Sequence, residues 1–194
     1  MKRRKISDFR RRKSNQTDYR KRLSLLKSGK PRLVVRKSLK NIQVQLVNYT
    51  DSGDTILASA SSTELNKLGW NYSCSNIPAA YLTGLLCGTR SKVAKVKAAV
   101  LDTGLYRPIA GSKLYAAAKG ASDTGLEVPH GDSEKLSEER LSGAHIASYA
   151  ETLEKDNKEK YESQFSHYIS SKTNPKDIQK QFEATKKKIM EAKK

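Results

Sequence analysis

Apolar and polar residues alternate in three consecutive segments of the first third of the chain, and this alternation is typical of half-buried β-strands. In the second segment Ile42, Val44 and Leu46 share one face, and the glutamines between them share the other. Turn-forming residues separate the segments, which span residues 32–38, 42–49 and 55–62. The pattern therefore predicts an antiparallel meander with one apolar face.

A helix is predicted immediately before the first of these strands. Tyr19, Leu23 and Leu26 recur at helical spacing, and Thr17 is a candidate N-cap. Gly29, followed closely by a proline, ends this helix. Basic residues continue through both the helix and the strand, so this segment combines positive charge with folded structure.

The middle of the chain alternates between helical and strand patterns. Residues 77–94 predict a helix with proline in its first turn, in which Gly84 and Gly88 form a notch for close backbone packing. A buried strand at 98–104 and a helix at 111–125 follow. This order predicts an α/β fold with a mixed sheet, formed by the meander plus one further strand and covered by helices.

The chain is helical and charged from residue 132 onward. Apolar residues at helical spacing continue to residue 154, and two more polar helices are predicted at 157–171 and 175–193. Asn174 is the expected cap of the last helix, with Pro175 at its first position. The chain is thus divided into a basic arm, an α/β domain and a helical C-terminal extension, at residues 1–16, 17–131 and 132–194.

The positive charge is concentrated near the N-terminus. The 194 residues have a formal net charge of +18. Residues 1–40 contain 17 Lys or Arg and two acids, whereas the remainder contains 21 and 18. A balance of +15 in 40 residues exceeds what solubility requires and is typical of a protein that binds nucleic acid. The arm lacks apolar periodicity, so we expect it to become ordered only on a partner.

Membrane binding fits this composition less well. Before Thr17 the large apolar residues are Ile6 and Phe9, too few for the buried face of an interfacial helix. No apolar run has the length of a transmembrane helix, and no apolar region follows the basic start as in a secretory signal. We therefore expect an intracellular protein with no membrane partner. The run KRRK at residues 2–5 suits either a nuclear address or phosphate contacts.

Patterns for catalysis and metal binding are weak. Asp102-Thr103-Gly104 matches the triplet of aspartic proteases, which need two such aspartates, and we favour a turn aspartate that accepts backbone N–H bonds. A ribonuclease-H-like nuclease would share the strand order, but the first predicted strand lacks the carboxylate that its metal ions require. Cys74, Cys87 and the histidines show no metal-ligand spacing. We predict no catalytic residue, no metal, no cofactor and no small-molecule substrate.

Arginine is abundant among the N-terminal cations, and its planar guanidinium fits phosphate and stacks on bases. Composition alone also permits a basic chromatin protein or a duplex-DNA-binding protein. The sequence contains no helix-turn-helix, zinc-finger or basic-zipper pattern that would favour this alternative.

Several long strings resemble one protein family, the archaeal and eukaryotic branch of ribosomal protein L-eighteen, a large-subunit protein that binds 5S rRNA. The similarity covers about residues 10–150, and long strings in one order are far more specific than a short motif. The strings are TDYRKRLSLLKSGKPRLVVRKS, IPAAYLTGLLCG and AAVLDTGLYRPIAGSKLYAAAKGASDTGLEVPH, which begin at residues 17, 77 and 98.

The resemblance implies a three-layer α/β domain and a non-catalytic role in the cytoplasmic large ribosomal subunit. It implies that the chain ties 5S rRNA to the large rRNA in the central protuberance, beside neighbouring ribosomal proteins. Composition and resemblance together select the RNA-binding candidates Arg3, Arg4, Arg10, Arg11, Arg12, Lys13, Tyr19, Arg20, Arg22, Lys27, Lys30, Arg32, Arg36 and Lys37.

Overall fold

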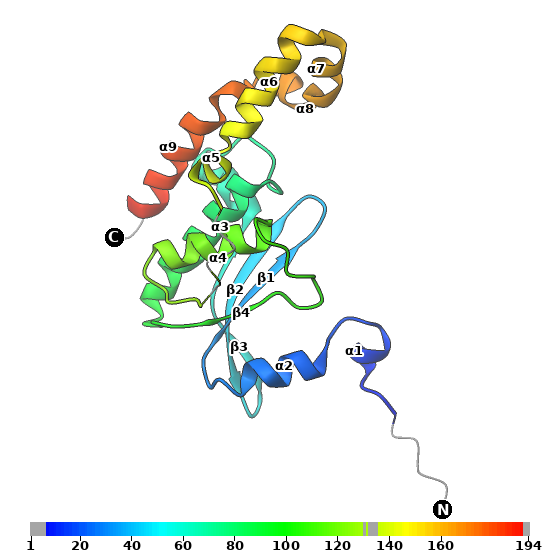
Figure 1. Cartoon of the computed structure of the whole chain (residues 1–194). Coiled ribbons are helices and arrows are strands. Elements are labelled where there is room, and N and C mark those ends of the chain that lie inside the picture. The colour runs from blue at the N-terminus through cyan, green and yellow to red at the C-terminus, as the bar shows by residue number, and fades with distance from the viewer. Residues whose placement is uncertain (1–6, 130, 132–135, 192–194) are drawn as a thin grey trace, which may run out of the picture.

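A computed structural model describes residues 7–129, 131 and 136–191 of the chain. The candidates Arg3 and Arg4 lie outside these ranges. The predicted α/β class is confirmed (Figure 1). The elements, with η for 3-10 helices, are α1 (Arg10–Lys13), α2 (Tyr19–Leu26), β1 (Arg32–Lys37), β2 (Ile42–Thr50), β3 (Gly53–Ser61), η1 (Ser62–Leu68), α3 (Ile77–Val93), β4 (Val100–Asp102), α4 (Lys113–Asp123), α5 (Glu138–Ser142), α6 (Ala144–Asp156), α7 (Lys158–Gln164), α8 (Ser166–Ser170), η3 (Pro175–Asp177) and α9 (Ile178–Glu191).

A four-stranded mixed sheet forms the centre of the fold, in the order β3-β2-β1-β4. β1 pairs antiparallel with β2, and β2 pairs antiparallel with β3, as the predicted meander requires. The further strand, β4, joins β1 in parallel and places Asp102 beside Val34. Neighbouring residues of adjacent strands point to the same face, so this register brings Asp102 to the side of the sheet that carries Arg32 and Arg36.

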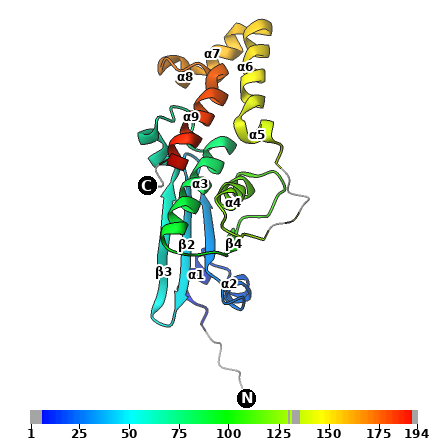
Figure 2. The same ribbon diagram turned by 90° about the vertical axis from the view of Figure 1, so that its left-hand side faces the viewer.

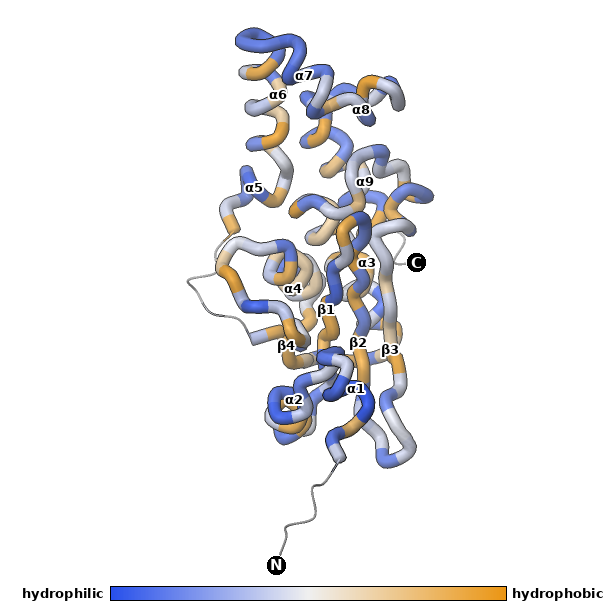
Figure 3. Tube along the Cα trace, turned by 90° about the vertical axis from the view of Figure 1, so that its right-hand side faces the viewer, coloured by the Kyte–Doolittle hydropathy of each residue, from blue (hydrophilic) through white to orange (hydrophobic). Residues whose placement is uncertain are grey.

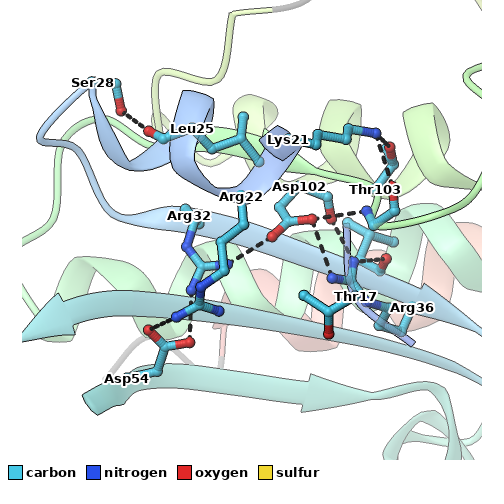
Figure 4. Close-up of polar contacts among 12 residues, drawn as sticks. Thr17, Lys21, Arg22, Leu25, Ser28, Arg32, Arg36, Asp54, Asp102 and Thr103 are labelled. Atoms are coloured by element: carbon cyan, nitrogen blue, oxygen red, sulfur yellow. Dashed lines mark hydrogen bonds and ion pairs between the residues drawn. The ribbon is translucent and has the colours of Figure 1, made fainter. Parts of the chain in front are cut away.

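Helices cover the two faces of the sheet unequally. Leu33, Val35 and Val44 are fully buried on the face against α3 and α4 (Figures 1 and 2). Arg32 and Arg36 alternate with them and point to the other face, which α2 crosses at one end (Figure 4). The three layers are therefore α3 with α4, the sheet, and α2. Hydropathy alternates along the strands, whereas α1 and α2 are mostly hydrophilic (Figure 3).

The last helix of the C-terminal extension returns to the domain. α9 packs on α3, and its residues Ile178, Phe182 and Ile189 belong to the buried core. Asn174 caps this helical segment as predicted, because its side chain accepts the N–H of Lys176. The helices α6, α7 and α8 instead project beyond the sheet, at the end of the molecule away from α2 (Figure 1).

The structure corrects several predicted helix boundaries. Asp18, and not Thr17, is the N-cap of α2, where its carboxylate accepts two backbone N–H groups of the first turn. Gly143, with φ of +87°, separates α5 from α6 where the periodicity indicated one helix. The helix predicted at 157–171 is interrupted at Phe165, and the arm contains the short helix α1.

Glycines allow α3 and α4 to cross in direct backbone contact. A Cβ at Gly84 would lie 1.9 Å from the carbonyl oxygen of Ala117, and one at Gly120 would lie 2.1 Å from that of Tyr81. The predicted notch at Gly84 and Gly88 is thereby confirmed, and Gly120 completes it from the opposite helix. Since α4 follows the loop that leaves β4, this crossing helps to fix where that loop lies.

We expect Gly84→Ala to lower the free energy of unfolding by about 3 kcal/mol, because the added methyl group cannot fit without separating α3 from α4. If helix propensity alone decided the outcome, alanine would instead raise the free energy of unfolding by about 1 kcal/mol. Urea unfolding measures the difference, with Glu183→Ala at an exposed position of α9 as the control. A stabilised Gly84→Ala variant would contradict the close crossing.

Candidate nucleic-acid interface

Lys21 attaches α2 to the loop that follows β4. Its Nζ donates to Thr103 Oγ1 at 3.0 Å and to the carbonyl oxygen of Gly104 at 2.9 Å (Figure 4). These acceptors are neutral and belong to a loop more than 80 residues away along the chain. Lys21 therefore serves to hold the helix against the domain, a role that no local pattern in the sequence indicates.

Arg32 lies at the centre of a buried ion-pair network beneath α2. Only 3% of this residue is exposed. Its Nη1 donates to Asp102 Oδ2 at 2.7 Å, and its Nη2 donates to Asp54 Oδ2 at 2.8 Å. Arg22 of α2 donates to the other oxygen of Asp54 at 2.8 Å (Figure 4). One guanidinium thus connects β1 with β4, β3 and, through Asp54, α2.

Asp102 also fixes the orientation of Arg36. Arg36 Nη2 lies 3.1 Å from Asp102 Oδ1, and its Nη1 donates to the backbone carbonyls of Asp102 and Val35 at 2.7 and 2.9 Å. The N–H of Gly104 donates to Asp102 Oδ1 at 2.8 Å, as expected of a turn aspartate. The turn role of Asp102 is confirmed, but the sequence did not indicate its two arginine partners.

Both carboxylates of the network have lowered pKa values. Burial by itself would raise the pKa of Asp102, but the charge of Arg36, the N–H of Gly104 and hydrogen bonds from both arginines outweigh it. Burial likewise opposes the effect of Arg22 and Arg32, which lower the pKa of Asp54. Three guanidinium groups therefore face two ionised carboxylates, and the protein itself neutralises most of their charge.

A second set of basic residues remains available to a ligand. These side chains are exposed, and they have no acidic partner within residues 7–129, 131 and 136–191. Lys37 additionally lies over the ring of Tyr106, with 5.3 Å from its Nζ to the ring centroid. The set, called the free cations below, is Arg20, Lys27, Lys30 and Lys37.

The short helix α1 presents four further cations on an exposed surface. Arg11 Nε donates to Thr17 Oγ1 at 2.9 Å, and Arg12 lies 3.4 Å from Asp8. Lys13 donates to Ser7, and Arg10 has no acidic partner in the described part of the chain. Contacts between exposed side chains contribute little to stability, so α1 is attached more weakly than α2.

An aromatic pair joins the arm to α2. The ring centroids of Phe9 and Tyr19 are 4.9 Å apart, with an angle of 41° between the ring planes. Phe9 is 69% exposed, although large aromatic rings are commonly covered. Tyr19 is among the RNA-binding candidates predicted from the sequence, whereas Phe9 beside it is not.

Between α2 and the sheet lies a polar hollow of about 520 Å³. Arg11 and Tyr19 line it from the N-terminal side, and Arg22, Arg36 and Asp102 line it from below. The buried network thus forms the floor of a concave surface, and the free cations of α2 and of the segment that follows it lie on the exposed surface nearby.

On the side of the sheet that faces α2, the part that this helix does not cover is open and partly apolar. Tyr49 and Ile56 are 50% and 57% exposed. A bulge shifts the register of β3 opposite Leu46 and Val47, so Ile56 reaches the open face while Ala58 is buried on the other. The strand pattern did not indicate this bulge, and it leaves apolar surface next to the basic helix.

The alternative sites considered from the sequence have structural explanations. Both oxygens of Asp102 are bonded to arginines, and within the described residues no three His, Cys, Asp or Glu side chains are grouped so as to hold a metal ion. Burial raises the pKa of Cys87 to about 12, so its thiol is unreactive at neutral pH. None of the helices in the described ranges combines the length and apolarity that crossing a membrane requires.

We expect Asp102→Asn to lower the free energy of unfolding by about 3 kcal/mol, because it leaves the buried Arg32 with one carboxylate instead of two. Asp51→Asn, in the exposed turn between β2 and β3, is the matched control and should change stability little. Urea unfolding at neutral pH compares the two variants. Equal stabilities for Asp102→Asn and the control would contradict the network.

The effect of Asp102→Asn on the free energy of unfolding should depend on pH. Because the folded-state pKa of Asp102 is below the ordinary value of 3.8, its contribution is complete above that value and is lost as the pH falls through the lower folded pKa. The stability difference between the native chain and Asp102→Asn should therefore be constant near neutrality and shrink below about pH 4.

Two comparisons with known proteins identify the family of this chain. A family described as ribosomal large subunit proteins 60S L5 and 50S L18 matches residues 3–98 and 92–131. The chain is also 50% identical over 182 residues to the large ribosomal subunit protein uL18 of Methanococcus maripaludis, an alignment that covers 94% of each chain. The family match includes α2, the sheet and every residue of the ion-pair network. The chain belongs to the family of ribosomal large-subunit proteins 60S L5 and 50S L18.

Proposed function

We propose that this chain binds 5S rRNA and attaches it to the large rRNA in the central protuberance of the large ribosomal subunit. The family and the uL18 relative support a structural role in the cytoplasmic large subunit. The choice of 5S rRNA as the ligand rests on two observations. Long strings of the sequence resemble the L-eighteen family, and the free cations lie on and beside α2.

The observation that carries the proposal is a division of the N-terminal cations into two sets. One set is used within the protein: Lys21 and Arg22 hold α2 on the domain, and Arg32 and Arg36 pair with carboxylates beneath it. The free cations therefore lie on a rigid support. Fixed positive charges at defined spacing match the phosphates of one folded RNA better than those of another, and this gives shape-dependent recognition.

This division changes the role of one candidate. The sequence predicts Arg32 as an RNA contact, but its guanidinium is buried and hydrogen-bonded to two carboxylates. We assign it a positioning role, because an RNA phosphate could reach it only by displacing Asp54 or Asp102. Arg36 is 41% exposed at its side chain and can offer its remaining edge to RNA while Asp102 orients it.

The open sheet face and the aromatic pair extend the proposed surface. Tyr49 and Ile56 offer apolar contacts of the kind that nucleobases use when they leave the helical stack. Phe9 at the start of α1 and Tyr19 at the start of α2 are in contact and can stack on an unpaired base. The proposed interface is thus continuous from the arm across α2 to the edge of the sheet.

We expect replacement of Arg20, Lys27, Lys30 and Lys37 by alanine to weaken binding to 5S rRNA and to reduce its preference over an unrelated folded RNA. The matched control replaces Lys155, Lys158, Lys160 and Lys187, which removes the same charge from exposed positions of α6, α7 and α9. Competition titrations at equal salt compare the variants. Equal losses in the two variants would show that net charge, and not the placement of the free cations, determines binding.

We expect deletion of residues 1–16 to weaken binding to all RNAs while the melting temperature changes by only a few degrees. If about six to ten phosphates are neutralised by the full chain, binding should weaken about a thousandfold between about 50 and 200 mM salt, and the deletion should make this slope shallower. Preference for 5S rRNA should partly survive, since α2 remains. Duplex DNA of equal length serves as the competitor, and a preference for DNA would favour the chromatin alternative.

A further inference from the structure

The C-terminal projection differs in charge from the rest of the chain. From residue 144 to residue 171, which includes α6, α7 and α8, there are five Asp or Glu and three Lys or Arg, in a protein whose net charge is +18. The projection lies at the end of the molecule away from α1 and α2 (Figure 1). A polyanion that is attracted to one end is therefore not attracted to the other.

The projection has a small rigid core of its own. Phe165 is buried at the break between α7 and α8, and its ring contacts those of Tyr161, Tyr149 and Tyr168 at centroid distances of 5.2, 6.5 and 6.1 Å. The aromatic cluster holds two short helices that would be unstable alone. The surface that they present is thus preformed, as in interfaces whose backbone changes little on binding.

An exposed, uncharged surface lies next to this core. Residues 163–171 contain no Lys, Arg, Asp or Glu, although 30% of the chain is charged. Ile169 is 46% exposed, and it lines a hollow of about 560 Å³ together with Tyr161, Ser166 and Ser170. Depletion of charge around an exposed apolar residue is typical of the centre of a protein–protein interface.

Three charged residues line this hollow, the carboxylates Glu154 and Glu162 and the cation Lys158. Glu154 pairs with Lys176 across the base of the projection. Glu162 also lines the hollow and has no basic partner among the residues that the structure describes. An exposed carboxylate beside an apolar hollow complements a partner that carries Lys or Arg next to an apolar side chain.

We infer that the hollow between α7 and α8 is a docking site for a basic protein of the large subunit, which inserts an apolar side chain beside Ile169 and pairs a cation with Glu162. RNA fits this surface less well than a basic protein, because phosphate binding needs cations and the hollow is lined by two carboxylates and a single lysine, Lys158. The chain would then hold RNA at its basic end and a basic protein at its projecting end. This inference rests on assembly into the large subunit and not on which rRNA is bound.

The test is site-specific photocrosslinking in assembled large subunits. The photoreactive residue p-benzoylphenylalanine replaces Ile169 in one variant and the exposed Val93, at the end of α3, in the control. After irradiation, the Ile169 variant should give an adduct that resists ribonuclease and is digested by protease. Mass spectrometry should place the link in a segment that contains Lys or Arg. An adduct with rRNA, a link to a second copy of this chain, a link to an acidic segment, or a yield no higher than the control would overturn the inference.

Reversing the charge of Glu162 tests whether the partner's cation contacts this residue at the rim of the hollow. Glu162→Lys should lower the yield of the protein adduct from position 169 by about fivefold or more, because it places a like charge opposite the partner's cation. Glu159→Lys makes the same change on the same helix outside the hollow and should leave the yield unchanged. Equal effects of the two substitutions would contradict a specific contact at Glu162. Titration of 5S rRNA with both variants should show unaltered affinity, so a failure here is distinguishable from a failure of the proposed RNA ligand.

Discussion

Burial of the Arg32 guanidinium is the constraint on which the arrangement of the N-terminal half depends. A cation this deeply buried is tolerated only when carboxylates neutralise and hydrogen-bond it. Asp102 and Asp54 meet this need from β4 and β3. β4 has only three residues and pairs with a single neighbour, so its ladder hydrogen bonds are few. The ion pair adds a bond at its end, where the chain enters the loop that receives Lys21.

The network also determines which cations remain for a ligand. Each carboxylate accepts hydrogen bonds from two arginines. Asp54 accepts from Arg22 and Arg32, and Asp102 accepts from Arg32 and Arg36. Because α2 is fixed by these bonds and by Lys21, the residues on its outer side keep a constant position relative to the sheet. A flexible basic tail could supply the same charge, but it could not hold that charge in one geometry. Rigid support is what allows a basic surface to distinguish one folded RNA from another.

Close packing of α3 on α4, on the opposite face of the sheet, also makes this support rigid. The glycine contacts between α3 and α4 let the two helices lie against the apolar side of the sheet without a gap. This core also receives α9, which returns from the C-terminal projection to α3. The projection is therefore anchored at both of its ends, by α5 and α9, and its aromatic centre makes it a stiff extension. The molecule combines a basic surface at one end with an acidic and uncharged surface at the other, on one continuous core.

The sequence by itself determined the strands, the mixed α/β order, the glycine notch of α3 and the concentration of charge before residue 41. These features are local, since alternation, helical spacing and composition act over short stretches of chain. The sequence did not determine which arginines are free. Asp54 and Asp102 lie 22 and 70 residues from Arg32, and they meet it only because of the strand register and the parallel addition of β4. The bulge that exposes Ile56 and the break at Phe165 likewise follow from packing. Only the tertiary structure decided how the charge is used, because pairing between distant strands sets the partners of each side chain.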